Sequence, residues 1–229
     1  MDLNSKLAIL DRIYGVYDEF AANLHIACKK YCSECCTHNV TITTLEGYHI
    51  VKNIIAYGKS SLFENIEKAM PKRRFQPQTT TNRLADICIK GKDPPKEENN
   101  CLRGSCPLLK DNQCPIYRAR PFGCRCFVSK HDCREKGYAE VDSLVLTVNN
   151  LFLQFIENVD FQGFSGNLID TLTFMASKKN RHNYKMNTLE NQDTGLIPNM
   201  KIKVLMIPPD HRVKIKPILN ALQCIKLDL

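Results

Sequence analysis

Residues 101–126 read Cys101-Leu-Arg-Gly-Ser-Cys106-Pro-Leu-Leu-Lys-Asp-Asn-Gln-Cys114-Pro-Ile-Tyr-Arg-Ala-Arg-Pro-Phe-Gly-Cys124-Arg-Cys126, and Cys133 follows shortly after. These six cysteines alternate with proline, glycine and arginine, and they follow neither a helical nor a strand period. Burial of small apolar side chains is therefore a poor explanation for them. We interpret the thiol groups as the purpose of this stretch and expect the fold to be organised around it.

A second group of cysteines stands upstream and consists of Cys28, Cys32, Cys35 and Cys36. Together the two groups hold ten of the chain's 12 cysteines. Consecutive α-carbons lie about 3.8 Å apart, which is below the usual disulfide range, so a bond between Cys35 and Cys36 would be strained. A chain of 229 residues also buries a core without cross-links. The pattern therefore favours metal binding or redox chemistry over structural disulfides.

Metal-ligand spacing supports this interpretation. Cys32 and Cys35, two residues apart, can turn both sulfurs toward one ion, and four thiolates close a zinc site or hold a [4Fe–4S] cluster. The first group offers too few dependable ligands, so we expect the second group to complete one shared centre. The expected cofactor is zinc or iron, with a [4Fe–4S] cluster as an alternative. The candidate ligands are Cys32, Cys35, Cys36, Cys106, Cys114 and Cys124, with Cys28 and Cys126 as further candidates.

Other polar residues near the groups receive more ordinary interpretations. Cys88 and Cys224 each stand alone on an apolar helical face and are expected to be buried small hydrophobes. Three histidines near the groups are interpreted as polar surface groups: His25, His38 and His131. Three interleaved arginines fit either donation to thiolate sulfurs or ordinary salt bridges: Arg118, Arg120 and Arg125.

Apolar spacing predicts helices over 5–27, 61–70, 81–90, 141–159, 167–176 and 213–226. Thr43 and Glu46 form a capping-box pattern that opens a further helix, which is expected to end before Gly58. Strands are expected at 39–43 and 202–207, a small hairpin at 108–117, and a polar, mobile segment at 178–195. The fold class is mostly α with minor β: one irregular helical domain organised around a cysteine-ligated metal centre, with a small β-hairpin in the cysteine-rich loop.

Residues 1–178, with the motifs at 28–36 and 101–133, are expected to form the metal-binding domain, and 179–229 a C-terminal extension packed on it. No apolar run approaches the roughly 20 residues of a membrane span, and the start of the chain lacks a charged segment followed by an apolar one. We therefore expect a cytoplasmic protein with no membrane partner.

The net charge is +8, from 32 Lys and Arg against 24 Asp and Glu. Basic residues mixed with aromatic ones at 68–75 and 178–185 have the composition of nucleic-acid-binding patches, although solvated helix ends and loops have it too. Part of the excess would also balance a four-thiolate site. Phosphate-binding loops, His-Glu-x-x-His and Gly-x-Ser-x-Gly are absent, so catalysis would have to depend on the metal.

The cysteine motifs resemble those of the YkgJ-type cysteine-cluster family, also called the CxxCxxCC domain and described as zinc- or iron-chelating. The second element carries the resemblance at Cys106, Pro107, Leu108, Leu109, Cys114, Ile116, Tyr117, Arg120, Pro121, Cys124, Arg125 and Phe127. The first element departs from the family pattern, because three residues rather than two separate Cys28 from Cys32, and Lys29 stands where a cysteine is expected. The resemblance covers about residues 28 to 133 and implies metal binding without a defined reaction.

The leading hypothesis is a cytoplasmic protein that carries a zinc, iron or iron–sulfur centre held by both cysteine groups. A similar cysteine element occurs in flagellin lysine methylases, so one alternative is a metal- or cluster-dependent protein-modifying enzyme with a methyltransferase-like role. The other alternative is a zinc-stabilised nucleic-acid-binding module that uses the basic segments. The identity of the substrate or protein partner does not follow from the sequence.

Overall fold

The computed structural model describes the chain except for residues 30, 98–103, 191–194 and 226–229. The described part is mostly helical, with one small antiparallel sheet. The α-helices are α1 (Leu3–Ala22), α2 (Thr44–Ala56), α3 (Ser61–Ala69), α4 (Thr81–Ile89), α5 (Phe122–Arg125), α6 (Cys133–Lys136), α7 (Ser143–Val159), α8 (Leu168–Ala176), α9 (Lys178–Lys185) and α10 (Arg212–Gln223). The strands are β1 (Thr41–Thr43), β2 (Phe164–Asn167) and β3 (Ile197–Pro198), and two short 3-10 helices are η1 (Tyr117–Ala119) and η2 (Pro209–His211).

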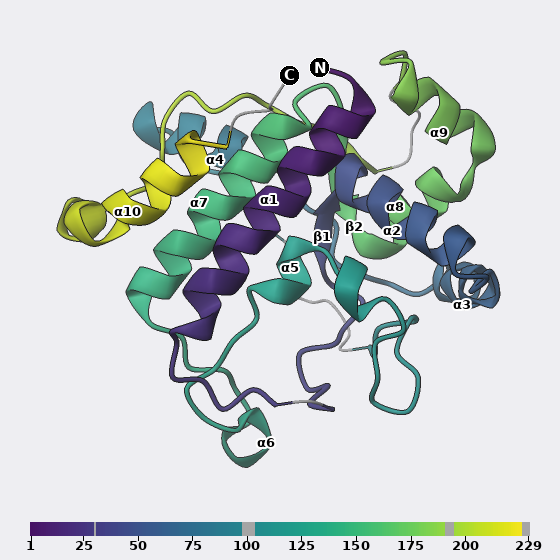
Figure 1. Cartoon of the computed structure of the whole chain (residues 1–229), viewed down its shortest axis with the longest axis horizontal. Helices are drawn as coiled ribbons and strands as arrows, with labels where there is room; N and C mark the ends of the chain where they lie inside the picture. The colour runs from purple at the N-terminus through teal and green to yellow at the C-terminus, as the bar shows by residue number, and fades with distance from the viewer. Residues whose placement is uncertain (30, 98–103, 191–194, 226–229) are drawn as a thin grey trace.

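The long helices α1 and α7 lie side by side and form one half of the helical core (Figure 1). Helix α10 packs on α1, and α4 and α5 pack on α7. Three aromatic side chains join these elements: the Tyr17 ring meets Phe122 and Phe152 edge-on, with ring centroids 4.8 and 5.1 Å away. Edge-on aromatic contacts add about 0.5–1.5 kcal/mol each beyond the area they bury. The short helix α5, which carries Cys124, is therefore fixed to the core through Phe122.

Helix α2 packs on α8, with α3 and α9 on the outside, to form the other half. The sheet lies beside this pair in the order β1-β2-β3, with Thr41 opposite Asn167 and Ser165 opposite Ile197. Gly166 is required in β2, because a Cβ atom there would lie 2.3 Å from Leu196 Cδ2. This close approach is what lets the segment before β3 pack onto the sheet.

Two buried carboxylates fix how these elements meet. Glu46 completes the capping box of α2 with Thr43, as the sequence predicts, and also accepts hydrogen bonds from the Tyr14 hydroxyl at 2.8 Å and the Phe122 amide at 2.7 Å. It thus joins α1, α2 and α5.

Gly58 follows α2 and has a φ of +64°, the left-handed conformation that favours glycine, so the helix stops before it as the sequence predicts.

Asp160, at the end of α7, is the second buried carboxylate. It accepts hydrogen bonds from Thr44 Oγ1 at 2.6 Å, the Leu45 amide at 3.0 Å, Tyr184 OH at 2.5 Å and Asn199 Nδ2 at 3.2 Å. The buried Lys6 ammonium lies 4.0 Å away. Burial raises the pKa of Asp160 to about 6, although these donors and Lys6 oppose the shift. We call Asp160 with these five partners the Asp160 hub; it connects α1, α2, α7, α9 and the segment after β3.

The predicted helices are found with small shifts in their ends, but three expectations need correction. The first helix ends at Ala22, so 23–27 is not helical. The segment 202–207 is not a strand: the amides of Ile202 and Met206 donate to Asn158 and Gln154, so this segment lies along α7. Part of the polar segment 178–195 forms α9, whose first turn is capped by Ser177.

The expected hairpin at 108–117 is present only as a tight turn. Asp111 and Asn112 both have positive φ, as a two-residue hairpin turn requires, and Lys110 and Gln113 form a single β-bridge on either side. Strand β2 was missed because Phe-Ser-Gly-Asn lacks the β-branched residues that mark strands. Part of the 179–229 extension packs on the rest through α9 on α8 and α10 on α1.

Candidate metal centre

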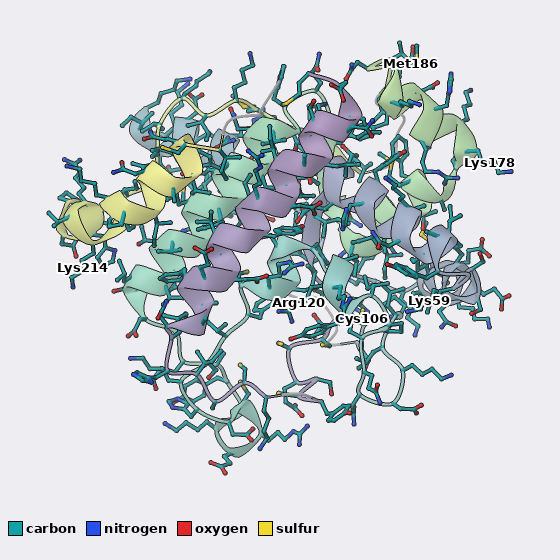
Figure 2. All side chains as sticks on the ribbon, viewed as in Figure 1. Lys59, Cys106, Arg120, Lys178, Met186 and Lys214 are labelled. Atoms are coloured by element: carbon teal, nitrogen blue, oxygen red, sulfur yellow. The ribbon has the colours of Figure 1, made fainter. Side chains whose placement is uncertain are left out.

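The two cysteine groups lie against each other in loops at the far end of the molecule from the start of α1 (Figure 1). A β-bridge pairs Thr37 with Ser105, and the Cys106 amide donates to the Cys36 carbonyl at 2.9 Å. The His38 amide donates to the Gly104 carbonyl at 3.1 Å. Figure 2 shows several sulfur atoms in these loops, near the labelled Cys106. Backbone pairing thus brings together thiols that are remote in sequence.

Gly104 is needed for this pairing. A Cβ atom at position 104 would lie 2.2 Å from the imidazole Cε1 of His38, far inside the contact distance. His38 is buried, contrary to the expectation of a surface group. Its ring therefore packs against the bare backbone of Gly104 and helps hold the two loops together.

Four of the cysteines form what we call the Cys36 set: Cys36, Cys106, Cys114 and Cys124. A negative charge on any of Cys106, Cys114 or Cys124 disfavours ionisation of Cys36, which places all four within electrostatic range of one another. Burial raises the pKa of Cys106 to about 11 and that of Cys124 well above the ordinary thiol value. These thiols would therefore stay protonated at neutral pH unless a positive charge joins them.

Cys35 and Cys36 have opposite tendencies to ionise. The Cys35 thiol donates a hydrogen bond to the Cys36 sulfur, and this bond is the main reason that the pKa of Cys35 is raised and the pKa of Cys36 lowered. Cys36 is thus the thiol of the set that ionises most readily. Cys35 was a candidate ligand in the sequence analysis, and in the structure its thiol donates a hydrogen bond to Cys36.

Arg120 provides the nearest unpaired cation. Its guanidinium stacks on the Tyr117 ring at 4.0 Å, and its Nε is buried with no hydrogen-bond partner among the described residues. Burial raises the pKa of Cys114, and the positive charges of Arg120 and Lys59 oppose that shift. Arg120 also favours ionisation of Cys35. A buried donor left without an acceptor costs about 1–3 kcal/mol, so this position favours an anionic group beside it.

Arg125 has a different role. Its guanidinium donates to the carbonyls of Arg118 at 2.8 Å and Arg120 at 3.1 Å, contacts Asp18 at 3.3 Å and stacks over Tyr14 at 4.1 Å. It therefore braces the loop around α5 against α1 instead of donating to a sulfur. Of the two interpretations given for the arginines, salt bridging fits Arg125.

A separate group, which we call the Cys133 set, consists of Cys28, Cys32, Cys133 and His131. All four line a small indentation of about 10 Å³. Burial raises the pKa of Cys28, and negative charge on Cys35, Cys32 or Cys133 would raise it further. The Ala27 amide donates to the Ser129 carbonyl at 2.8 Å and ties the two loops together. Cys133 belongs to the second cysteine group, which the sequence predicted to meet the first, but it was not among the candidate ligands.

The remaining cysteines are distributed as follows. Cys126 is partly buried against the core, where its sulfur lies 3.6 Å from the Gly123 carbonyl and burial raises its pKa to about 12. Cys101 lies outside the described residues. Cys88 and Cys224 are both exposed, so the expectation of buried hydrophobes was wrong: α4 and α10 turn these positions to solvent. Within the described ranges, no three His, Cys, Asp or Glu side chains are already arranged to hold a metal ion.

The basic segments are partly used inside the fold. Arg74 pairs with Asp170 and donates to the carbonyls of Met70 and Lys72, and Arg181 donates to the carbonyls of Met175 and Ala176. These arginines hold turns in place, which is the ordinary explanation for such residues. Among the described residues, no helix has the length and apolar character needed to cross a membrane.

No protein-family model, curated protein or solved structure matches this chain. The resemblance to the YkgJ-type family therefore depends on its motif residues alone.

Proposed function

We propose that this protein binds a metal centre through the Cys36 set, with one thiolate from the first cysteine group and three from the second. Four thiolates are the ligand number of a closed tetrahedral zinc site, and they also suit iron or a [4Fe–4S] cluster. The backbone pairing between the groups supports this choice, because it holds Cys36 beside Cys106 without any added atom. Binding would still have to draw the sulfurs together.

The observation that carries the proposal is the unpartnered Arg120 Nε beside the buried thiols. A buried guanidinium nitrogen without an acceptor is unfavourable, and partial burial of the neighbouring thiols opposes their ionisation. A metal ion resolves both, since it removes the protons from the thiols and leaves a net negative centre that attracts the guanidinium. A zinc ion would close the loops as a structural clamp, whereas iron would add redox chemistry.

Metal analysis of purified protein tests the proposal. Cys36→Ser and Cys114→Ser come from different cysteine groups, yet each is expected to lose most of the same centre, measured as metal per chain after anaerobic purification. Both variants should also show faster amide hydrogen exchange in 31–40 and 104–126, because metal-binding energy is folding energy for these loops. Cys88→Ser is the matched control and should keep all its metal. Full metal content in both Cys36→Ser and Cys114→Ser would refute the proposal.

Arg120→Met tests whether the Arg120 guanidinium stabilises the proposed centre. Methionine preserves packing against Tyr117 but removes the charge, so the variant should lose metal to a chelator about 10–100-fold more readily than the wild type does. Arg118→Met is the control, since residue 118 is exposed and two positions away. Equal chelator resistance of the two variants would mean that Arg120 does not serve the centre.

One cavity favours a second candidate function, that of a metal-dependent enzyme. It has a volume of about 250 Å³ and is lined mainly by threonines and apolar side chains between β1, α4 and α7. Glu46 lines this cavity and also influences the ionisation of Cys124 and Cys126. A small substrate group bound there would lie near the centre. Retention of a ligand by wild-type protein, and its loss in Thr80→Val or Leu84→Trp, would support this candidate.

A further inference from the structure

We propose that the Cys133 set forms a second metal site, separate from the Cys36 set, which takes a single tetrahedral divalent ion of the zinc class. The donor set is three thiolates and one imidazole, a combination found in closed structural zinc sites. This site does not depend on the Cys36 centre, and two of its members, Cys133 and His131, were not among the candidate ligands chosen from the sequence.

The placement of the four side chains is the first argument. They come from two stretches of loop that line the indentation, 27–29 with Cys32 and 131–134. The Cys32 amide donates to the Lys29 carbonyl at 3.1 Å, and Tyr31 adopts a positive φ of 69°. A non-glycine residue in this conformation is uncommon and marks a sharp turn. This turn places Cys28 and Cys32 on the same indentation.

The size of the indentation is the second argument. A volume of about 10 Å³ corresponds to roughly one water-sized sphere, which is too small for an organic substrate. A single ion fits this space if the side chains close around it. Because Cys28 and Cys32 lie in a segment without helix or strand, small backbone movements suffice to bring them in.

The environment of the His131 imidazole also supports the site. Its Nε2 is buried and lies 2.8 Å from Glu140 Oε2, yet it makes no aligned hydrogen bond. A metal-bound imidazole usually has a carboxylate near its other nitrogen, which orients the ring and makes it a better ligand. Glu140 is placed for that role. The His131 side chain as a whole is 21% exposed, so only its Nε2 edge is shielded from solvent.

Basic side chains around the indentation suit a metal site of net negative charge. Three thiolates with a divalent ion leave a net charge of −1, and two basic residues, Lys29 and Arg134, line the same indentation. Lys29 lies 3.8 Å from Asp132, and Arg134 lies 3.0 Å from Glu34, so both are held near the thiols by acidic neighbours.

The test uses the full chain, stripped of metal and titrated with zinc against a chromophoric chelator, with zinc per chain measured afterwards. Cys133→Ser should bind one zinc fewer than the wild type, whereas Cys224→Ser should bind the same number. His131→Ala should weaken the second zinc by more than about 100-fold, since losing a ligand exceeds the effect of losing a supporting residue. His131→Cys should restore binding, and His25→Ala should change nothing.

Each outcome decides the matter. Unchanged zinc content in both Cys133→Ser and His131→Ala would overturn the second site while leaving the proposed function intact. Loss of all zinc in Cys133→Ser and in Cys114→Ser alike would mean one shared centre, which also overturns it. If only Cys114→Ser has no effect, the proposed function fails and the second site stands. Should Cys133→Ser fail to fold, the two His131 variants decide.

Discussion

The Asp160 hub is a buried group of polar side chains and the Cys36 set a partly buried one, and they differ in how far their members are hydrogen-bonded. Asp160 receives four hydrogen bonds within 3.2 Å and has Lys6 at 4.0 Å, so neighbours from four other segments compensate its burial in part. The Cys36 set gathers thiols whose pKa values burial raises, next to a cation with an unpartnered nitrogen. The difference separates a core whose buried charge has partners from cysteine loops in which a guanidinium nitrogen has none, and it is the basis for proposing a metal centre in those loops.

Removal of the hub carboxylate should have the largest effect. Asp160→Ala leaves a buried Lys6 without its counter-charge and strands the four donors, so the free energy of unfolding in urea should fall by about 3–5 kcal/mol. Asp18→Ala is the control, because Asp18 is mostly exposed and pairs with Arg125 at the surface; its loss should cost at most about 1 kcal/mol. Equal effects of the two substitutions would show that the hub is not the centre of the core.

Glu46 connects the two regions, and its substitution should affect both. Glu46→Gln replaces a carboxylate oxygen with an NH2 group, which cannot accept hydrogen bonds. The Tyr14 hydroxyl and the Phe122 amide, which hold α5, then compete for the one remaining oxygen. We expect unfolding to become easier by about 2–3 kcal/mol and metal retention to weaken, because α5 carries Cys124. Glu64→Gln, at an exposed position on α3, should change neither quantity. A loss of stability with unchanged metal retention would separate the two regions.

The sequence predicted most of the helices well and the grouping of the cysteines only in part. Apolar spacing located α7, and the Thr43–Glu46 pattern located the start of α2, because both signals are local. The sequence predicted that the two cysteine groups share one centre because the first group lacked ligands; the structure pairs their backbones at Cys36 and Cys106, and the shared centre stays a prediction. The Cys133 set could not be predicted, because a loop contact between 27 and 129 leaves no periodic pattern. The exposure of Cys88 was missed because its helix has apolar residues on more than one face.

The pH dependence of stability should report the hub. Since burial raises the pKa of Asp160 to about 6 from its ordinary 3.8, the folded protein binds more protons than the unfolded chain between pH 4 and 6. The contribution of Asp160 to stability is therefore greatest below pH 4 and decreases as the pH rises to 6. Asp160→Asn should remove this component of the slope when urea midpoints are compared across that range. An unchanged slope in the variant would assign the pH dependence to other groups.

The smallest effects are expected at the two exposed cysteines. Cys88 on α4 and Cys224 at the end of α10 lie outside both thiol sets, so replacing either with alanine removes a solvent-facing sulfur and no metal ligand. Each variant should keep its full metal content and unfold within about 0.5 kcal/mol of the wild type, as surface substitutions usually do. Each should also lose one thiol that reacts rapidly with a thiol reagent in the native protein, because thiols held by metal react slowly. Loss of metal from either variant at unchanged stability would contradict the division of the cysteines into two sets and two surface residues, since a remote sulfur would then be serving the centre.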